Sequence, residues 1–108
     1  MKVAVWGLGK HSINNILPAL LRNKNFSLQG VCSRNQDTLR NIADQFSCNK
    51  WSNSEEMLDD SSLDAVFLCT PPGLHYEQGI KILNANKHFW CEKPLTLNNK
   101  NSIDLLRI

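Results

Sequence analysis

The stretch KVAVWGLGKHS, residues 2–12, passes from a short apolar segment into two glycines and then a serine. A continuous apolar run such as residues 3–6 is typical of a parallel strand that is covered on both faces. A Gly-x-Gly turn between a strand and a helix begins the dinucleotide-binding fingerprint, whose third small residue is usually glycine. Here that third position is Ser12. The turn alone therefore predicts either a phosphate-binding loop with one glycine replaced or a plain strand-to-helix connection.

The overall composition is that of an ordinary globular domain. The chain has 108 residues, 42% of them hydrophobic and 20% charged, which suits one domain with one core. A formal net charge of +2, without clustered lysine and arginine, disfavours nucleic acid as a partner. No apolar stretch approaches the roughly 20 residues that cross a bilayer, and the first apolar run is too short for a signal peptide. We therefore expect a cytoplasmic protein without membrane contact.

The cysteines predict buried thiols in place of disulfides or a metal site. There are four, with no C-x-x-C pair among them: Cys32, Cys48, Cys69 and Cys91. Three fall at the ends of predicted strands, where cysteine serves as a small apolar residue. A zinc site that includes His88 and Cys91 is disfavoured, because residues three apart on a strand face opposite sides of the sheet. We expect reduced cysteines and no bound metal.

Apolar spacing predicts strands that alternate with helices along the whole chain. Strands are expected over residues 3–6, 28–32, 49–51, 63–69 and 87–94. Helices are expected over residues 11–22, 39–46 with Asn35 as its cap, 54–60, 76–83 and from 98 onward. Pro18 should bend the first helix or confine its regular part to the residues before it. The fold class is α/β, a doubly wound parallel sheet with right-handed crossovers and helices on both faces.

Four chemically unusual stretches follow four of these strands, namely residues 7–12, 33–34, 70–72 and 92–94. All strands of a parallel sheet point the same way, so their carboxyl ends meet at one edge, where such folds bind ligands. The topology therefore predicts that segments far apart in the sequence form one site.

The glycine turn supplies the first part of that site. Gly7 allows the sharp turn out of the strand, and Gly9 allows the backbone to approach a pyrophosphate. Ser12 is small enough for the third position, and its hydroxyl is suited to cap the turn or to touch phosphate. Leu8, Lys10 and His11 are expected to contribute mainly through their backbone.

The second stretch indicates which dinucleotide is preferred. About 20 residues after the glycines, an NAD-binding strand usually ends in an acidic residue that binds the ribose hydroxyls. This sequence has Ser33 and Arg34 there and no acid. A hydroxyl and a guanidinium would hold a 2′-phosphate, which a carboxylate would repel. The pattern favours NADP, although Arg34 could instead stack on the adenine of either cofactor.

The third and fourth stretches add candidate contacts that are less specific. Thr70 and Pro71 leave the most apolar strand, and His75 follows in the first turn of the next helix. A single histidine there is either structural or a contact on the cofactor side. Glu92 and Lys93 stand directly before Pro94. This charged pair is either part of a solvated turn or lies where the nicotinamide is bound.

The residues of all four stretches resemble the Gfo/Idh/MocA family of NAD(P)-dependent oxidoreductases. The resemblance covers essentially the whole chain, and the spacing of TPPGLH and EKP is its most specific part. It implies that residues 1–108 form an NAD(P)-binding Rossmann domain, followed in the family by a last strand and a substrate domain that are absent here. It also implies hydride transfer between NADP(H) and a sugar, polyol or nucleotide-linked sugar.

Carried over by position, Lys93 resembles the family's catalytic lysine beside the nicotinamide and substrate. Glu92 would shape that loop, while Thr70, Pro71 and His75 would line the path of the cofactor. We expect this chain to be a fragment that binds cofactor without catalysing, and a homo-oligomer is conceivable for the full-length protein. The alternative is a non-catalytic, NADP-sensing regulator on the same fold.

Overall fold

The computed structural model describes residues 1–91, which form five strands and the helices between them. The strands are β1 (Lys2–Trp6), β2 (Ser27–Cys32), β3 (Asn49–Trp51), β4 (Ala65–Leu68) and β5 (His88–Cys91). The α-helices are α1 (Leu17–Arg22), α2 (Gln36–Phe46), α3 (Ser54–Leu58) and α4 (His75–Asn84). A π-helical segment, Ser12–Ile16, precedes α1, and a 3-10 turn, Pro72–Leu74, precedes α4. The predicted helix from residue 98 and the stretch 92–94 lie outside the described residues.

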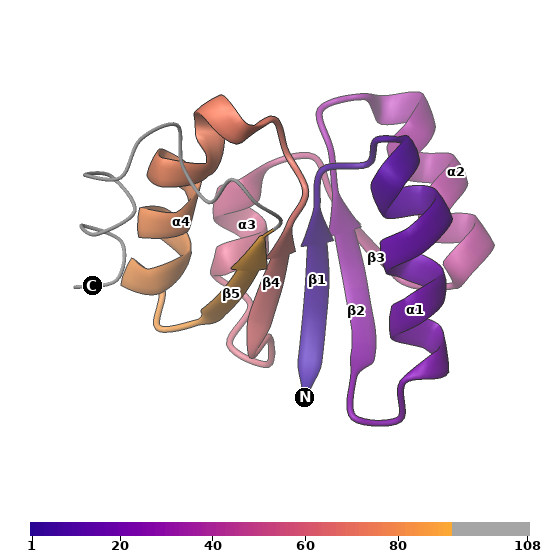
Figure 1. Ribbon diagram of the computed structural model, residues 1–108, viewed down its shortest axis with the longest axis horizontal. Coiled ribbons are helices and arrows are strands. Elements are labelled where there is room, and N and C mark those ends of the chain that lie inside the picture. Colours follow the sequence, from indigo (N-terminus) through magenta and orange to yellow (C-terminus); the bar gives the residue numbers. More distant parts are fainter. Residues whose placement is uncertain (92–108) are drawn as a thin grey trace.

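The strands form one parallel sheet in the order β3-β2-β1-β4-β5, which confirms the predicted fold class (Figure 1). β1 lies in the centre, where Val5 is paired with Val31 of β2 and with Phe67 of β4. The chain therefore adds β2 and β3 on one side of β1 and then crosses back to add β4 and β5 on the other side. The reversal beside β1 is the topological switch point at which open α/β sheets bind ligands.

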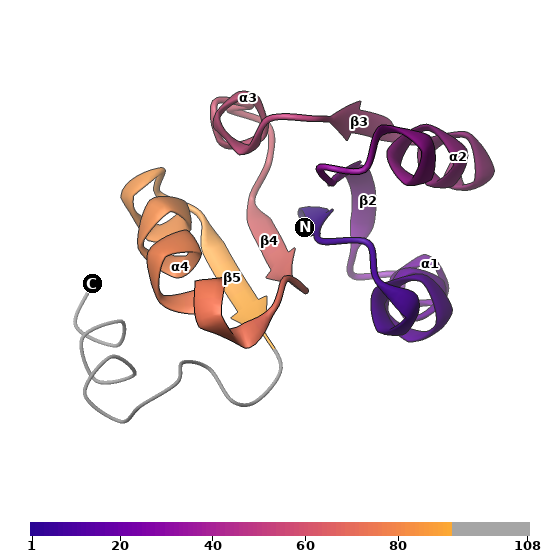
Figure 2. The same ribbon diagram turned by 90° about the horizontal axis from the view of Figure 1, so that it is seen from above.

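Helices cover both faces of the sheet (Figure 2), and an apolar core lies on each face, as a doubly wound fold requires. On one face, β1 and β2 pack against α1 and α2 through Leu17, Leu39 and Ile42. On the other face, Met57 of α3 and Ile82 of α4 pack against the same sheet. Adjacent residues of β1 belong to opposite cores, and residues 3–6 of this strand are all buried. Burial on both faces explains why the strand is a continuous apolar run.

The first helix differs from the sequence prediction in the effect of Pro18. The prediction that regular structure would be confined to the residues before the proline is wrong, whereas the alternative, a bend at Pro18, stays a prediction. The segment before it is π-helical, with the Leu17 N–H donating to the Ser12 carbonyl, and the regular α-helix continues through Pro18 to Arg22. Pro18 stands in the first turn of α1, where a missing N–H breaks no bond within that helix.

The remaining boundaries agree with the predictions to within a few residues. Asn35 caps α2 as expected, and its side chain accepts a hydrogen bond from the Thr38 N–H at 3.1 Å. β4 is shorter than the predicted strand because Asp64 and Cys69 lie just outside it. Within residues 1–91, no helix has the length and apolarity needed to cross a membrane.

All four cysteines are free thiols, as predicted. Cys32 is buried and the other three are half-buried, in keeping with a packing role. Burial raises the pKa of the Cys32 thiol from 9.0 to about 11, so this group is protonated at neutral pH. Among the residues that the structure describes, no three His, Cys, Asp or Glu side chains are placed to hold a metal ion.

Candidate functional site

The glycine turn leaves β1 at the carboxyl edge of the sheet and passes directly against the loop that follows β4. Gly7 has a φ of +105°, which only glycine adopts readily. A Cβ at this position would lie 2.7 Å from the Cys69 carbonyl carbon and 2.8 Å from the Thr70 nitrogen. The Gly7 N–H donates to the Cys32 carbonyl at the end of β2. Gly7 thus joins the ends of three strands, and any larger residue would force them apart.

Gly9 has a different environment. A Cβ built on it would meet no atom within 4 Å, and its φ is not positive. The fold itself therefore does not require glycine here. The space beside Gly9 is open, as expected where a backbone must be reached by a ligand.

Ser12 explains how the turn tolerates a residue other than glycine at the third position. The side chain is only 1% exposed, and its hydroxyl lies 2.8 Å from the Gly7 carbonyl and 3.1 Å from the Gly9 carbonyl. The hydroxyl donates to the turn that precedes it and closes that turn from inside. Of the two roles expected for Ser12, the structure shows the capping one.

The other residues of the turn differ in exposure. Leu8 packs against the core on the α1 side, whereas Lys10 and His11 are exposed. His11 Nδ1 accepts a hydrogen bond from the Asn15 side-chain amide at 3.0 Å. The first hydrogen bond of the following helix runs from the Ile13 N–H to the Gly9 carbonyl. The start of a helix thus faces the same edge as Gly9, an arrangement that favours anions.

A cavity of about 330 Å³ lies at this edge between the end of β2 and α4. Ser33 and Arg34 line one wall, and Glu77, Gln78 and Lys81 of α4 line another. The Ser33 hydroxyl accepts a hydrogen bond from the Asn35 N–H at 3.2 Å, which holds the loop against the start of α2. The Arg34 side chain is exposed. The wall from β2 thus presents a hydroxyl and a guanidinium, as the sequence predicted.

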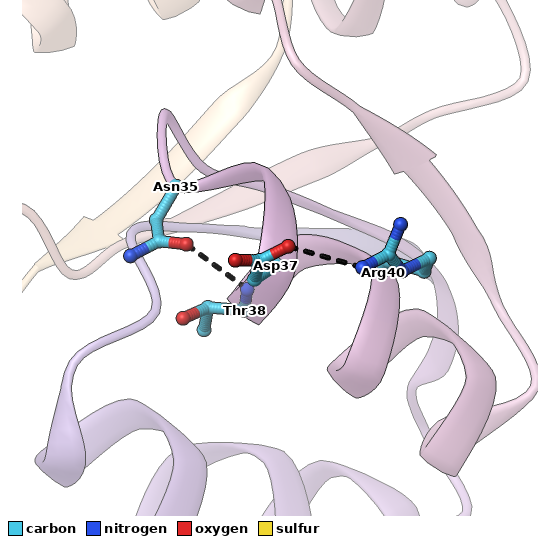
Figure 3. A network of polar contacts seen from close by, with 4 residues as sticks. All are labelled: Asn35, Asp37, Thr38 and Arg40. Atoms are coloured by element: carbon cyan, nitrogen blue, oxygen red, sulfur yellow. Dashed lines mark hydrogen bonds and ion pairs between the residues drawn. The ribbon is translucent and has the colours of Figure 1, made fainter.

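The nearest carboxylate in α2 does not neutralise Arg34. Asp37 forms an ion pair with Arg40 at 3.0 Å, one turn along the helix, and Figure 3 shows the two side chains facing one another. Within residues 1–91, the Arg34 guanidinium has neither an ion pair nor a hydrogen bond. The Asp37–Arg40 pair is exposed and stabilises the helix little. Among residues 1–91, the charge of Arg34 is therefore not neutralised by Asp37.

The loop after β4 is held by the first turn of α4. His75 is 3% exposed, and its Nε2 lies 2.6 Å from the Thr70 carbonyl oxygen. The Thr70 hydroxyl donates to the side-chain carbonyl of Gln78. Pro71 is exposed beside them. His75 is therefore buried inside the loop, which is the structural one of the two roles expected for it.

The structure thus brings together the first three of the four predicted stretches. Glu92 and Lys93 lie outside the described residues, so their position stays a prediction. Sequence reasoning missed Gln78 and the two charged residues of α4 in the cavity, Glu77 and Lys81. Their signal was present: they follow His75 at helical spacing and so fall on the first turns after the loop.

Comparison with known proteins identifies the family of this chain. The model of an oxidoreductase family with an NAD-binding Rossmann fold matches residues 1–108. The chain belongs to this family. Its name, Gfo/Idh/MocA, is the one that the sequence motifs suggested, and the chain is an NAD(P)-binding oxidoreductase domain of that family.

Two relatives of this chain are a reductase of a dTDP-linked sugar and an inositol dehydrogenase. The chain is 31% identical over 96 residues to a dTDP-3,4-didehydro-2,6-dideoxy-alpha-D-glucose 3-reductase of Saccharopolyspora spinosa, covering 89% of this chain and 29% of the relative. It is 32% identical over 100 residues to a myo-inositol 2-dehydrogenase of Thermotoga maritima, covering 91% of this chain and 29% of the relative. The chain therefore spans less than a third of the length of these curated relatives.

Solved structures agree with the fold in detail. A 3-ketoreductase from Actinomadura kijaniata, in complex with NADP and TDP-benzene, superposes with a TM-score of 0.95 at 27% identity. The match covers 99% of this chain and 33% of that one. The described Gfo/Idh/MocA domain therefore has the backbone of a domain that forms part of an NADP complex in a relative.

Proposed function

We propose that this chain is the cofactor-binding part of an NADP-dependent oxidoreductase that acts on a sugar, a polyol or a nucleotide-linked sugar. The observation that carries the preference for NADP is the end of β2, where Ser33 and Arg34 line the cavity and Arg34 has no ion pair with any residue of 1–91. The loop between β2 and α2 offers no carboxylate to a ribose 2′-hydroxyl. A 2′-phosphate would find there a charged donor and a hydroxyl.

The described residues fit a dinucleotide. The open space at Gly9 and the start of the helix behind it suit a pyrophosphate, which needs close approach to the backbone. The cavity beyond β2 has room for the adenosine end, with Arg34 and Lys81 as cations and Glu77 as the single acid among its lining residues. Ser12 and His75 would act from inside the loops, by holding their shape.

The chemistry of the bound cofactor is hydride transfer to or from the carbon that carries the reacting oxygen. The role proposed for this chain is to bind the cofactor and to orient it along the carboxyl edge. Lys93, which follows β5 by two residues, is proposed to orient or polarise the reacting hydroxyl or carbonyl, with Glu92 shaping its loop. Similarity to an inositol dehydrogenase and to a reductase of a dTDP-linked sugar supports this substrate class.

A titration tests the proposal directly. The 108-residue chain, whose folding is checked by circular dichroism, is titrated with NADPH and with NADH while the fluorescence of either cofactor is followed. We expect NADPH to bind more tightly, by roughly tenfold or more, because one charged hydrogen bond is worth about 1.5–3 kcal/mol. A folded chain that binds neither cofactor at millimolar concentration would refute the function. Tighter binding of NADH would refute the preference for NADP alone.

A further inference from the structure

The first turn of α4 holds Thr70 at two points. His75 Nε2 lies 2.6 Å from the Thr70 carbonyl oxygen, and the Gln78 side chain accepts from the Thr70 hydroxyl. Because a carbonyl only accepts, His75 must carry its proton on Nε2. The backbone and the side chain of Thr70 are therefore both fixed by residues one helical turn apart.

The other ring nitrogen of His75 indicates that the bond from Nε2 to the Thr70 carbonyl is retained for more than the stability of the fold. Nδ1 is buried, and it is the one buried side-chain atom in the described part of the chain that lacks a hydrogen-bond partner. An unpaired buried acceptor is unfavourable and calls for a reason. A leucine would fill the same space without an unpaired acceptor, but it would leave the Thr70 carbonyl without a hydrogen bond from residue 75.

Thr70 in turn is in contact with the glycine turn. The Gly7 Cα approaches the peptide between Cys69 and Thr70 so closely that an added Cβ would lie 2.8 Å from the Thr70 nitrogen. The Gly7 carbonyl then accepts from the buried Ser12 hydroxyl, which also lies 3.1 Å from the Gly9 carbonyl. An unbroken series of contacts thus runs from His75 through Thr70 and Gly7 to Ser12.

We propose that His75 is a positioning residue of the cofactor site, which acts through Thr70 on the glycine turn. The inference rests on the proposed function, since it assigns to a buried residue the task of shaping that site. His75 does not touch the cofactor. It sets the place of Thr70, against which Gly7 packs, so that the turn at Gly9 is formed before a pyrophosphate arrives.

Coupling between two residues that do not touch separates this role from simple stabilisation of α4. NADPH affinity is measured for the 108-residue chain and for His75→Leu, Ser12→Ala and the double variant. We expect His75→Leu to weaken binding roughly 3- to 10-fold, the range for the loss of one neutral hydrogen bond. We expect the double variant to lose less than the product of the two single losses, because both act on the same turn.

Two further variants serve as rescue and control. His75→Gln, which places an amide donor near the position of Nε2, should recover most of the affinity, whereas His75→Asn is too short to do so. His88→Leu changes an exposed histidine of β5, which is outside the cavity, and should leave the affinity unchanged.

The outcomes are distinct. If the loss of NADPH affinity in the double variant equals the product of the two single losses, or if His75→Leu binds NADPH as the wild type does, the positioning role is overturned. In both cases NADPH binding by the wild type still upholds the proposed function. Binding of neither NADPH nor NADH by the folded wild type would overturn the function itself. If His75→Leu does not fold, equal affinities of His75→Gln and His75→Asn would overturn the role.

Discussion

The two glycines of the first turn are expected to respond in opposite ways to the same substitution. Gly7→Ala introduces a Cβ at 2.7–2.8 Å from three backbone atoms of residues 69 and 70, at a φ of +105°. A non-glycine residue at positive φ costs roughly 1–2 kcal/mol, and overpacking against atoms that cannot rotate away costs a further 1–3 kcal/mol or so. The sum is about 2–5 kcal/mol, a large part of the roughly 5–15 kcal/mol that stabilises a domain.

Gly9→Ala is the matched control, because its Cβ meets no atom within 4 Å. We expect a change in the free energy of unfolding within about 0.5 kcal/mol, as for other surface substitutions. The same Cβ enters the space proposed for the pyrophosphate, so NADPH binding should weaken while stability does not. Gly7→Ala should lower both.

Urea denaturation followed by circular dichroism measures the first quantity, and NADPH fluorescence measures the second. The midpoint of Gly7→Ala should fall with an unchanged slope, which reports stability separately from compactness. Equal unfolding free energies of Gly7→Ala and Gly9→Ala would refute the close approach of the two loops. Wild-type NADPH affinity in Gly9→Ala would refute the pyrophosphate at this turn.

Three further predictions concern the end of β2 and the start of α2. Arg34→Asp should shift the preference from NADPH towards NADH by roughly tenfold or more. The control Arg22→Asp, at the opposite end of the molecule, should leave the ratio of the two affinities unchanged. An unchanged ratio in Arg34→Asp would contradict the assignment of Arg34 to the 2′-phosphate. Asn35→Ala removes the cap seen in Figure 3 and should lower the free energy of unfolding by about 1 kcal/mol. The control Asn41→Ala, on the exposed face of the same helix, should leave it unchanged. Equal unfolding free energies of the two variants in urea denaturation would show that the cap is unimportant. The Cys32 thiol has a pKa of about 11 in the folded chain against 9.0 when exposed, so its contribution to stability is complete below pH 9 and is lost as the pH rises through 11. Cys32→Ala should therefore show a shallower loss of stability between pH 9 and 11, and an identical pH profile would contradict the burial.

Several elements could be predicted from local patterns alone. The continuous apolar run at residues 3–6 indicated a strand covered on both faces, and all four residues are buried. Asn35 before an amphipathic segment indicated a capped helix, and the cap is present. The alternation of strands and helices then predicted a parallel sheet, which placed the three described stretches at one edge. These inferences succeeded because each depends on neighbours within a few residues or on a general rule of chain connection.

The effect of Pro18 could not be predicted in the same way. Its spacing within the apolar pattern predicted a disturbed helix, but the pattern does not show where the regular turns begin. In the structure, the π-helical segment ends just before α1, so the proline falls in the first turn of a new helix. Packing of Leu17 and Leu20 against the sheet favours this arrangement, and those partners lie on other strands.

The sequence by itself determined the order of the elements within residues 1–91, the edge at which the three described stretches meet and the residue types that this edge presents. Only the tertiary structure decided which of those side chains are exposed at this edge and which are buried in the protein. For Ser12 and His75 the sequence left both a structural role and a cofactor contact open, and in the structure both are buried and bonded to the loops themselves. The physical reason is that burial depends on contacts such as that of Gly7 with Thr70, between segments some sixty residues apart, which no local pattern specifies.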